Sequence, residues 1–457
     1  MIIVVAFDKI DCPHSLKTLG EFNKVQNSVS KSNKHEIPQW DLSDLYESYE
    51  SDEIQGDIDV LKNMTAEFAS EYRGKIATLT PKTFSFAIRD YEKIVHKLNK
   101  VSSYAQLLYA ANTSDPDVGR FYQIIQEMLT EISANTLFFT LEINKVSAET
   151  FNRFLKNDTV NLYLPWLNDL RLFKDYELSE DLEHLLHQKS ISCRSAWVRL
   201  FDQTIADMRI QIGNEYYTLT ETLNFLSETD KKTRRKAAKA LGKTLKHHER
   251  VFALITNTLA KDKSIDDNLR GYKTPMEFRD LTNRIESHVV DALVDAVKNS
   301  YQNLSHRYYK MKAGWFGVTT LKYWDRNAPR PNQSSRKYTW YEARNIVLES
   351  YRGFEPLLAD IAEPFFDELW IDAVPKNGKD GGAFSHPTVP SIHPYILMNF
   401  HGKARDVMTL AHEIGHGVHQ TLCNEKGALM ADTPLTLAET ASVFGEMLTF
   451  ERILKEE

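Results

Sequence analysis

The sequence predicts a mainly α-helical protein, built from two helical lobes and a small β element. Apolar residues recur at steps of three and four in most segments after residue 40, as they do on the buried face of a helix. Only three short segments, 208–219, 321–325 and 393–400, are typical of strands. A hydrophobic content of 42% with 26% charged residues is that of a globular protein with a sizeable core.

Residues 1–36 are expected to form a loose leader. Met1–Phe7 is apolar, but it is too short to span a membrane and lacks the basic residues that begin a signal peptide. An N-terminal helical lobe over residues 37–205 should follow. Thr80-Pro81 predicts a capped helix start with proline at the first helical position. We expect a further long helix over residues 118–146.

A predicted hairpin marks the start of the second lobe, residues 206–457. Two short β segments, Met208–Ile212 and Glu215–Leu219, flank Gly213-Asn214, and this dipeptide permits a primed turn. Helical segments then follow as far as residue 370, interrupted by a predicted strand at Leu321–Asp325.

A histidine pair on one predicted helix is the strongest chemical signal. Residues 412–416 are His-Glu-Ile-Gly-His, and four residues are close to one helical turn. His412 and His416 therefore project from one face and can hold a single Zn²⁺. Glu413 is placed to take a proton from water on that metal. A solvated helix face fits poorly as an alternative, because this helix is otherwise largely apolar.

Two residues compete as the third ligand. His419 shares the histidine face, but three ligands from one straight helix would splay too far apart for a tetrahedron, so we place it beside the metal. Glu439 lies early in a second predicted helix, residues 434–454. Thr436 and Glu439 also match a capping box, but after the histidine pair we favour the ligand. Glu446 falls on the same face and could accept a ring N–H of a ligand histidine.

Two segments before the histidine pair could contact a substrate. Residues 375–382 contain three glycines and form either a connecting loop or a mobile loop that closes on substrate. Residues 393–400 suit an edge strand that pairs with an extended peptide, with a core strand as the alternative. The candidate substrate-binding residues are Gly381, Gly382, Ala383, Phe384, His393, Tyr395 and Asn399.

Four motifs together resemble a known family. They are His412-Glu-Ile-Gly-His-Gly-Val-His419, Glu439-Thr-Ala-Ser442, Gly381-Gly-Ala-Phe384 and His393-Pro-Tyr-Ile-Leu-Met-Asn-Phe400. The first two are similar to the zinc oligopeptidases of the thimet oligopeptidase and neurolysin family. The other two are typical of its oligoendopeptidase F branch. The resemblance extends from about Trp40 to the end of the chain.

This resemblance implies a zincin fold of the gluzincin type and metalloendopeptidase activity on short peptides. The residues that match His412, His416 and Glu439 would bind one zinc ion per chain. The residue that matches Glu413 would be the general base, and Glu446 would lie next to the ligands.

One departure leaves an alternative function open. The family continues into a helical segment whose histidine and tyrosines stabilise the oxyanion, and nothing in this sequence matches that segment. The chain could therefore be a weakly active or inactive zinc-binding relative that needs the missing segment. Phe450, Ile453 and Leu454 continue the apolar face of the last predicted helix without a glycine stop, so we expect association through an exposed surface there.

Net charge and cysteine content limit which partners and which cellular compartment are expected. A net charge of −7 argues against a general nucleic-acid surface. Three scattered cysteines do not make a disulfide framework and suit a reducing cytosol. We therefore expect a cytoplasmic protein that binds neither nucleic acid nor membrane, and the resemblance implies oligopeptides as its substrates.

Overall fold

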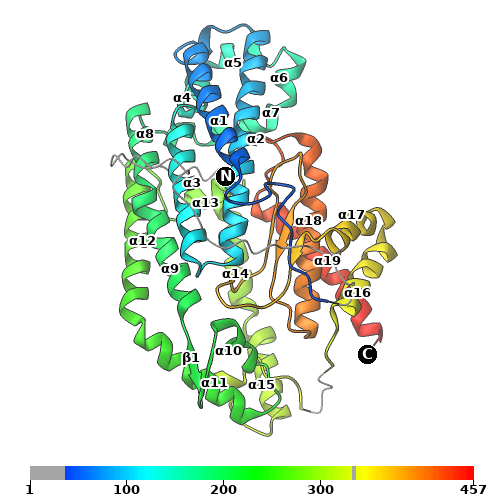
Figure 1. The fold of residues 1–457 in the computed structure, drawn as a ribbon. Helices are drawn as coiled ribbons and strands as arrows, with labels where there is room; N and C mark the ends of the chain where they lie inside the picture. Colours follow the sequence, from blue (N-terminus) through cyan, green and yellow to red (C-terminus); the bar gives the residue numbers. More distant parts are fainter. Residues whose placement is uncertain (1–35, 332–335, 457) are drawn as a thin grey trace. The chain divides into compact units, whose positions relative to one another are not determined.

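The computed structural model is mainly α-helical, as the sequence predicts, over the residues that it describes, 36–331 and 336–456 (Figure 1). All but the last residue of the predicted leader lies outside this range. Two compact units make up the chain. Unit 1 comprises the residues up to Ser195, Lys337–Lys376 and Gly382–Glu457, and unit 2 comprises Ala196–Arg336 and Asn377–Gly381.

The first part of unit 1 is a set of helices around an aromatic core. Thr80 caps α2 as predicted, because its side chain accepts a hydrogen bond from the N–H of Thr83. The long helices α1, α2 and α3 pack side by side (Figure 1). The helices are α1 (Asp52–Tyr72), α2 (Pro81–Ala111), α3 (Pro116–Ala134), α4 (Leu137–Lys145), α5 (Ala148–Phe154), α6 (Asp158–Leu162), α7 (Leu164–Leu172) and α8 (Glu180–Lys189).

The single long helix predicted over residues 118–146 is wrong, because the chain breaks between α3 and α4. The hydroxyl of Thr136 donates to the carbonyl of Ser133, and such local bonds compete with helix continuation. The break turns Phe138 and Phe139 into the core, where neither side chain is exposed. Burial of two aromatic rings outweighs the modest preference for an unbroken helix.

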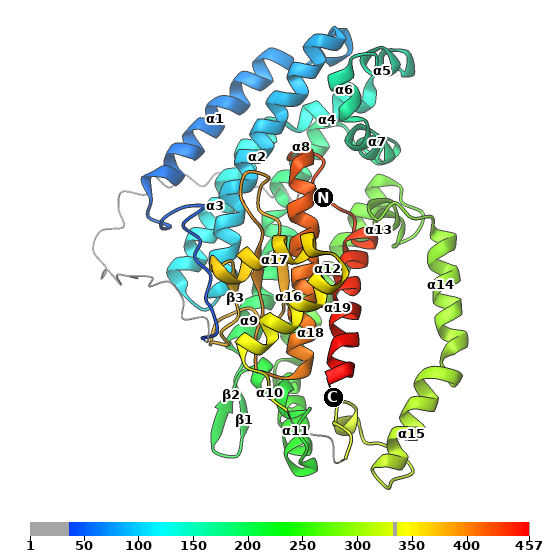
Figure 2. The ribbon, with the colours of Figure 1, turned by 90° about the vertical axis from the view of Figure 1, so that its right-hand side faces the viewer.

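The second part of unit 1 contains a small sheet and four helices that share another apolar core. In Figure 2, α18 and α19 lie side by side and run in opposite directions. The elements are α16 (Trp340–Phe354), α17 (Pro356–Asp367), β3 (Ile371–Asp372), β4 (Phe384–His386), β5 (Tyr395–Leu397), α18 (Ala404–Cys423) and α19 (Leu435–Glu456).

The strand predicted at the sheet edge is instead its central strand. The sheet has the order β3-β5-β4, with β5 parallel to β3 and antiparallel to β4. All three residues of β5 are buried. The short neighbours β3 and β4 lack a recognisable strand pattern, so periodicity does not reveal that β5 is flanked on both sides. Among the described residues, strand β4 is therefore a free edge.

The first and second parts of unit 1 are joined by direct hydrogen bonds. The N–H of Asp41 donates to the carbonyl of Leu369 at 2.9 Å. The N–H of Ala373 donates to the carbonyl of Pro38 at the same distance. The compact units thus divide the chain differently from the predicted lobes, because most of the N-terminal lobe shares a unit with α18 and α19.

Unit 2 contains the remaining helices and the predicted hairpin. Strands β1 and β2 pair antiparallel, and Gly213 in their turn has a φ of 70°, which favours glycine. The elements are α9 (Ala196–Asp207), β1 (Ile210–Ile212), β2 (Glu215–Tyr217), α10 (Leu219–Phe225), α11 (Lys231–His247), α12 (Glu249–Arg270), α13 (Glu277–Thr282), α14 (Ser287–Ser300) and α15 (Arg307–Trp315).

The strand predicted at Leu321–Asp325 is wrong. Tyr323–Asp325 forms a single 3-10 turn instead. This turn places the buried carboxylate of Asp325 2.7 Å from the guanidinium of Arg234. A buried charge needs such a partner, so this ion pair favours the 3-10 turn over a strand. The local sequence does not reveal the pair. Within the described part of the chain, no helix is long and apolar enough to cross a membrane.

Candidate metal centre

Helix α18 carries the histidine pair and has one strongly apolar face. Its first turn is fixed by Asp406, whose carboxylate accepts hydrogen bonds from the N–H groups of His401 and Lys403, both at 2.9 Å. Its buried apolar residues are Val407, Leu410, Ala411, Ile414 and Val418. Burial of this face fixes the rotation of the helix and leaves His412 and His416 on a partly exposed face.

Two glycines allow α19 to approach α18 closely. A Cβ atom on Gly415 would lie only 2.8 Å from the Cα of Ser442 on the other helix. A Cβ atom on Gly445 would overlap the hydroxyl of Tyr351, which donates a hydrogen bond of 2.6 Å to the carbonyl of Ala411. The close approach brings a carboxylate from α19 to the histidines of α18.

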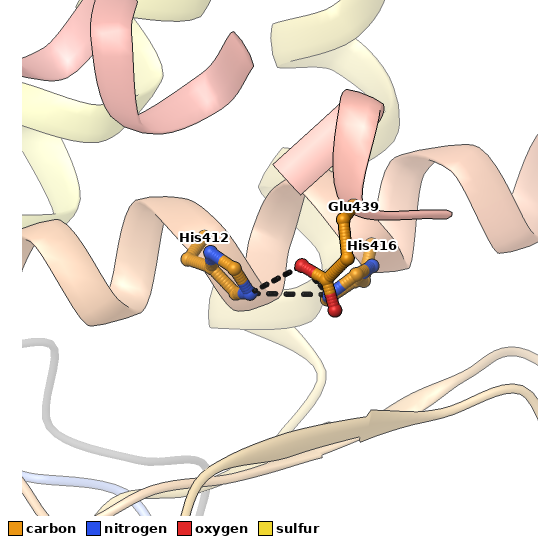
Figure 3. A group of neighbouring side chains, drawn as sticks. All are labelled: His412, His416 and Glu439. Atoms are coloured by element: carbon orange, nitrogen blue, oxygen red, sulfur yellow. Dashed lines mark hydrogen bonds and ion pairs between the residues drawn. The ribbon is translucent and has the colours of Figure 1, made fainter. Parts of the chain in front are cut away.

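Three ligand atoms from the two helices converge on one point (Figure 3). The Nε2 atoms of His412 and His416 are 3.2 Å apart. Oε2 of Glu439 lies 3.4 Å from Nε2 of His412 and 3.7 Å from Nε2 of His416. Ligands about 2.05 Å from a tetrahedral Zn²⁺ would be separated by about 3.3 Å. The three separations therefore fit a single zinc ion with little adjustment.

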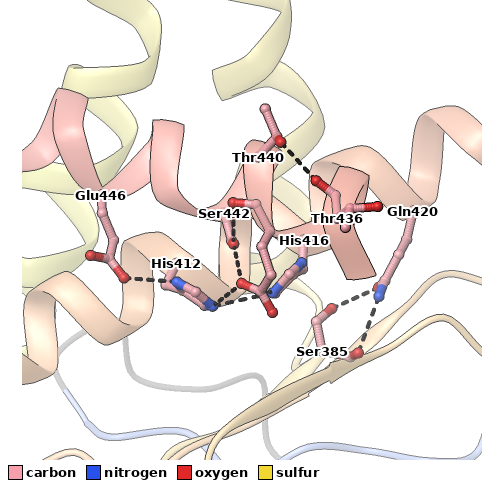
Figure 4. Close-up of polar contacts among 9 residues, drawn as sticks. Ser385, His412, His416, Gln420, Thr436, Thr440, Ser442 and Glu446 are labelled. Atoms are coloured by element: carbon pink, nitrogen blue, oxygen red, sulfur yellow. Dashed lines mark hydrogen bonds and ion pairs between the residues drawn. The ribbon is translucent and has the colours of Figure 1, made fainter. Parts of the chain in front are cut away.

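Neighbouring side chains orient two of these ligands (Figure 4). The ring N–H at Nδ1 of His412 donates to Oε1 of Glu446 at 2.7 Å, which leaves the lone pair of Nε2 facing the convergence point. The hydroxyl of Ser442 donates to Oε2 of Glu439 at 2.9 Å. Lone pairs facing one another across such short distances favour a bound cation.

Glu413 is the buried acid beside this group. It directly follows His412 in α18, and the residue is 5% exposed. Burial raises its pKa to about 8, and the Glu439 and Glu446 carboxylates act in the same direction. Burial lowers the pKa of His416, which favours the neutral imidazole that a metal requires.

The remaining candidates for the metal site take other positions. His419 is not part of the converging group among the described residues. Helix α19 begins at Leu435, so Thr436 is a helical residue rather than the cap residue of the alternative capping box. The carboxylate of Glu439 points to the histidines instead.

The candidate substrate-binding residues separate into buried and accessible groups. Tyr395 has no exposed surface, and we therefore assign it no contact with a peptide. His393 stacks on Trp370 with ring centroids 3.6 Å apart, and its Nε2 lies 2.9 Å from Asp44. Tyr395 and His393 thus contact Trp40 and Asp44, which precede α1 in the chain.

The other candidates lie at or near the free edge strand. Phe384 is on β4, and Ala383 precedes it; both are partly exposed. The amide of Asn399 donates to the carbonyl of Gly382 at 3.3 Å and so supports the chain before β4. Gly381 belongs to unit 2, where it lies against Thr220.

Sequence reasoning missed three residues around the site. Tyr351 lies between α18 and α19, and Gln420 and Ser385 link α18 to β4. Gln420 carried a detectable signal, since it follows His416 by four residues and shares its helix face. Tyr351 comes from a distant helix, and its position depends on packing that the local sequence does not show.

Comparison with known proteins identifies the family. The model of peptidase family M3 matches residues 224–457, just over half of the chain. The chain belongs to peptidase family M3. The oligopeptidase F model matches residues 142–210, so the predicted oligoendopeptidase F branch is also confirmed.

Relatives of this branch align with nearly the whole chain. The oligopeptidase PepF of Bacillus subtilis (strain 168) is 25% identical over 452 residues, which are 96% of this chain and 66% of the relative. An oligoendopeptidase F homolog of Lactococcus lactis subsp. lactis (strain IL1403) is 24% identical over 93% of this chain and 71% of its own length. The M3 chain described here thus spans about two thirds of the length of these relatives.

Solved structures share the fold. The oligoendopeptidase-F of Enterococcus faecium superimposes with a TM-score of 0.64 at 20% identity, over 89% of this chain and 68% of that one. PZ peptidase A with an inhibitor gives a TM-score of 0.70 at 15% identity, over 88% of this chain and 68% of that one. The mainly helical zincin-type fold predicted from the sequence is thereby confirmed.

Proposed function

We propose that this chain is a zinc-dependent metalloendopeptidase that cleaves internal bonds of short peptides. The observation that carries the proposal is the convergence of His412, His416 and Glu439, with separations that fit a tetrahedral zinc ion. Membership of the M3 family supports a peptidase in particular. The two imidazoles and the carboxylate would hold one ion per chain, with a position left open for the reaction.

The chemistry follows from the residues around that ion. When bound, Zn²⁺ would polarise the scissile carbonyl and lower the pKa of a water molecule toward about 7. Glu413 takes the proton of the attacking water and passes it to the leaving amine. A carboxylate whose pKa is raised to about 8 in the chain alone, and lowered again by a neighbouring cation, is suited to both steps.

Strand β4 is the proposed docking edge for the peptide. It is the last strand in the order of the described sheet, and it packs against α18. An extended peptide added to this edge would lie along the metal helix, with its main chain held by hydrogen bonds. Ala383 and Phe384 are the candidate contact residues in this arrangement, and Gly382 and Asn399 support the backbone before them.

Metal titration and a peptidase assay test this function. The purified chain should bind about one zinc per molecule, and His412→Ala or His416→Ala should abolish binding. Glu413→Gln should retain zinc and lose hydrolysis of an internally quenched peptide. Stoichiometric zinc in both histidine variants would exclude this site, and near wild-type turnover of Glu413→Gln would place the general base elsewhere.

A second candidate function is a zinc-binding relative that is weakly active by itself. The observation that favours it is the apolar surface of α19, where Val443, Phe444, Met447 and Phe450 are exposed. In this case stoichiometric zinc would accompany little or no hydrolysis. Addition of the part of a longer relative that does not align with this chain would then raise the rate, since an oxyanion donor typically contributes about 10²–10³ in rate.

A cytoplasmic location belongs to the same proposal. Cys193 and Cys423 are free thiols, as a reducing compartment maintains them. Measurement of the protein in separated cell fractions would test it.

A further inference from the structure

The amide of Gln420 connects the metal helix to the free edge of the sheet (Figure 4). Its Nε2 donates to the carbonyl oxygen of Ser385 at 3.1 Å. Its Oε1 accepts a hydrogen bond of 2.7 Å from the hydroxyl of the same serine. Both ends of one side-chain amide are thus held by a single residue of β4. Gln420 lies one turn after His416, so this contact is adjacent to the metal centre.

The backbone of Ser385 faces away from the sheet. The N–H of Ile396 in β5 donates to the carbonyl of Trp370 on the β3 side. Backbone groups alternate along a strand, so those of Tyr395 and Leu397 face β4, where they pair with His386 and Phe384. Ser385 pairs across from Ile396, and its backbone therefore points to the open edge.

We infer that Gln420 is a positioning residue that holds β4 at a set distance from α18 and ends the peptide-pairing edge at Ser385. This inference rests on the proposed function. The amide occupies the place that a backbone donor of a bound peptide would take at the Ser385 carbonyl. A peptide can therefore add to the edge only on the side of β4 that precedes Ser385.

The residues on either side of Ser385 also limit where a peptide can pair with β4. Alternation along an extended chain gives the backbones of Ala383 and Pro387 the same outward direction as that of Ser385. Pro387 has no N–H and cannot donate to an added strand. With the Ser385 carbonyl taken by Gln420, Ala383 is the position that keeps both a donor and an acceptor for a peptide. Gln420 thus determines how much of a substrate the edge can bind.

Two zinc-binding probes separate the edge from the metal. Acetohydroxamate tests the metal alone, and a tripeptide hydroxamate tests the metal together with the edge. Their affinities would be measured by calorimetry on the zinc-loaded full chain, for wild type, Gln420→Ala and Gln420→Glu. Thr421→Val is the matched control, because the Thr421 hydroxyl donates within α18, to the carbonyl of Gly417.

The expected result is a loss confined to the peptide probe. Gln420→Ala should bind the tripeptide hydroxamate about tenfold more weakly, because β4 loses the side chain that sets its distance from α18, with unchanged affinity for acetohydroxamate. Gln420→Glu should be at least as weak, because a carboxylate of the same size cannot donate to the Ser385 carbonyl. Thr421→Val should match wild type.

Three results would overturn the inference. The first is a Gln420→Glu variant that binds the peptide probe like wild type, since it would show that only the size of the side chain matters. The second is an equal loss for both probes, and the third is a wild type that gains nothing from the tripeptide. If Gln420→Ala does not fold, Ser385→Ala carries the test, because it removes only the bond to Oε1. Failure of wild type to bind acetohydroxamate would instead refute the proposed metal site.

Discussion

The Nδ1 atom of His412 on α18 lies 2.7 Å from Oε1 of Glu446 on α19. Glu446 follows Glu439 by seven residues, close to two helical turns, so both carboxylates face α18. One helix thus supplies both a proposed metal ligand, Glu439, and the acceptor that orients a second proposed ligand, His412. The strength of the metal site should therefore depend on α19 as much as on the histidine pair.

Substitution of Glu446 tests this dependence. Glu446→Gln should lower zinc affinity by about 10–100-fold, because it removes the negative charge that orients His412 and raises its basicity. Helix content should not change. Glu451→Gln is the matched control on α19, since Glu451 is exposed and its carboxylate lies 4.0 Å from Lys455, away from the histidines. Competition with a chromogenic chelator would measure both, and equal affinities would contradict the assigned role.

Substitution of Glu439 tests its proposed role as the third metal ligand. Glu439→Gln keeps a polar group of the same size but supplies a poor zinc ligand. We expect zinc affinity to fall by well over tenfold, with little change in helix content by circular dichroism. If zinc binding persists at near wild-type affinity instead, Glu439 is not a ligand.

Because α18 and α19 lie so close together, we expect a methyl group added at their contact to lower the stability of the protein. Gly445→Ala should destabilise the protein by about 1–3 kcal/mol and weaken zinc binding, because the new Cβ would overlap the Tyr351 hydroxyl. Gly56→Ala in α1 is the control. A Cβ atom added there would meet no neighbouring atom of the described chain within 4 Å, so it should stabilise the helix by about 0.5–1 kcal/mol.

A double substitution would locate the cause of that cost. Tyr351→Phe removes the overlapping oxygen, so it should relieve part of the effect of Gly445→Ala. Chemical denaturation of the two single variants and the double variant would give the coupling. Additive free energies of unfolding would show that the hydroxyl is not the obstacle.

The convergence of His412, His416 and Glu439 was largely predictable from the sequence, because most of the information for it is local. His412, Glu413 and His416 lie within one helical turn and a half, and helical periodicity alone gives their common face. Glu439 required one further assumption, that a second helix folds back on the first. The sequence could not show the contact of Tyr351 with the helix pair, since that contact joins residues 60 positions apart.

The β element was less predictable, because its strands are only two or three residues long. Periodicity over so few residues carries little information, and the position of β5 between two neighbours is a property of the assembled sheet. The two compact units also divide the chain differently from the predicted lobes, for a similar reason. Hydrogen bonds such as that from Asp41 to Leu369 join segments that are remote in the chain.

The stability of unit 1 should depend on pH through His386. Burial lowers the pKa of this side chain to about 4, against about 6.5 in the unfolded chain. Between these values the unfolded state binds the additional proton, so the free energy of unfolding falls as the pH decreases from about 6.5 to about 4. The slope from one proton is at most about 1.4 kcal/mol per pH unit.

His386→Gln is the variant that isolates this effect. Its amide can still reach the Ser103 hydroxyl, which lies 2.9 Å from Nε2 of His386, but it does not titrate. Urea denaturation at several pH values, with a chelator present, should give a shallower pH dependence for the variant above pH 4. Identical profiles would show that His386 is not the titrating group.

The exposed side of α19 leads to the last prediction. Ile453 packs in the core, whereas Phe450 and Leu454 on the same turns are exposed, together with Met447 one turn earlier. Exposed apolar side chains in such a row favour association. Sedimentation should show a mean mass that rises with protein concentration, and Met447→Glu with Phe450→Glu should abolish the rise while zinc stoichiometry stays the same. Leu162→Glu, at an exposed leucine on α6, is the control and should associate like wild type. Association that persists in the double variant would place the contact on another surface.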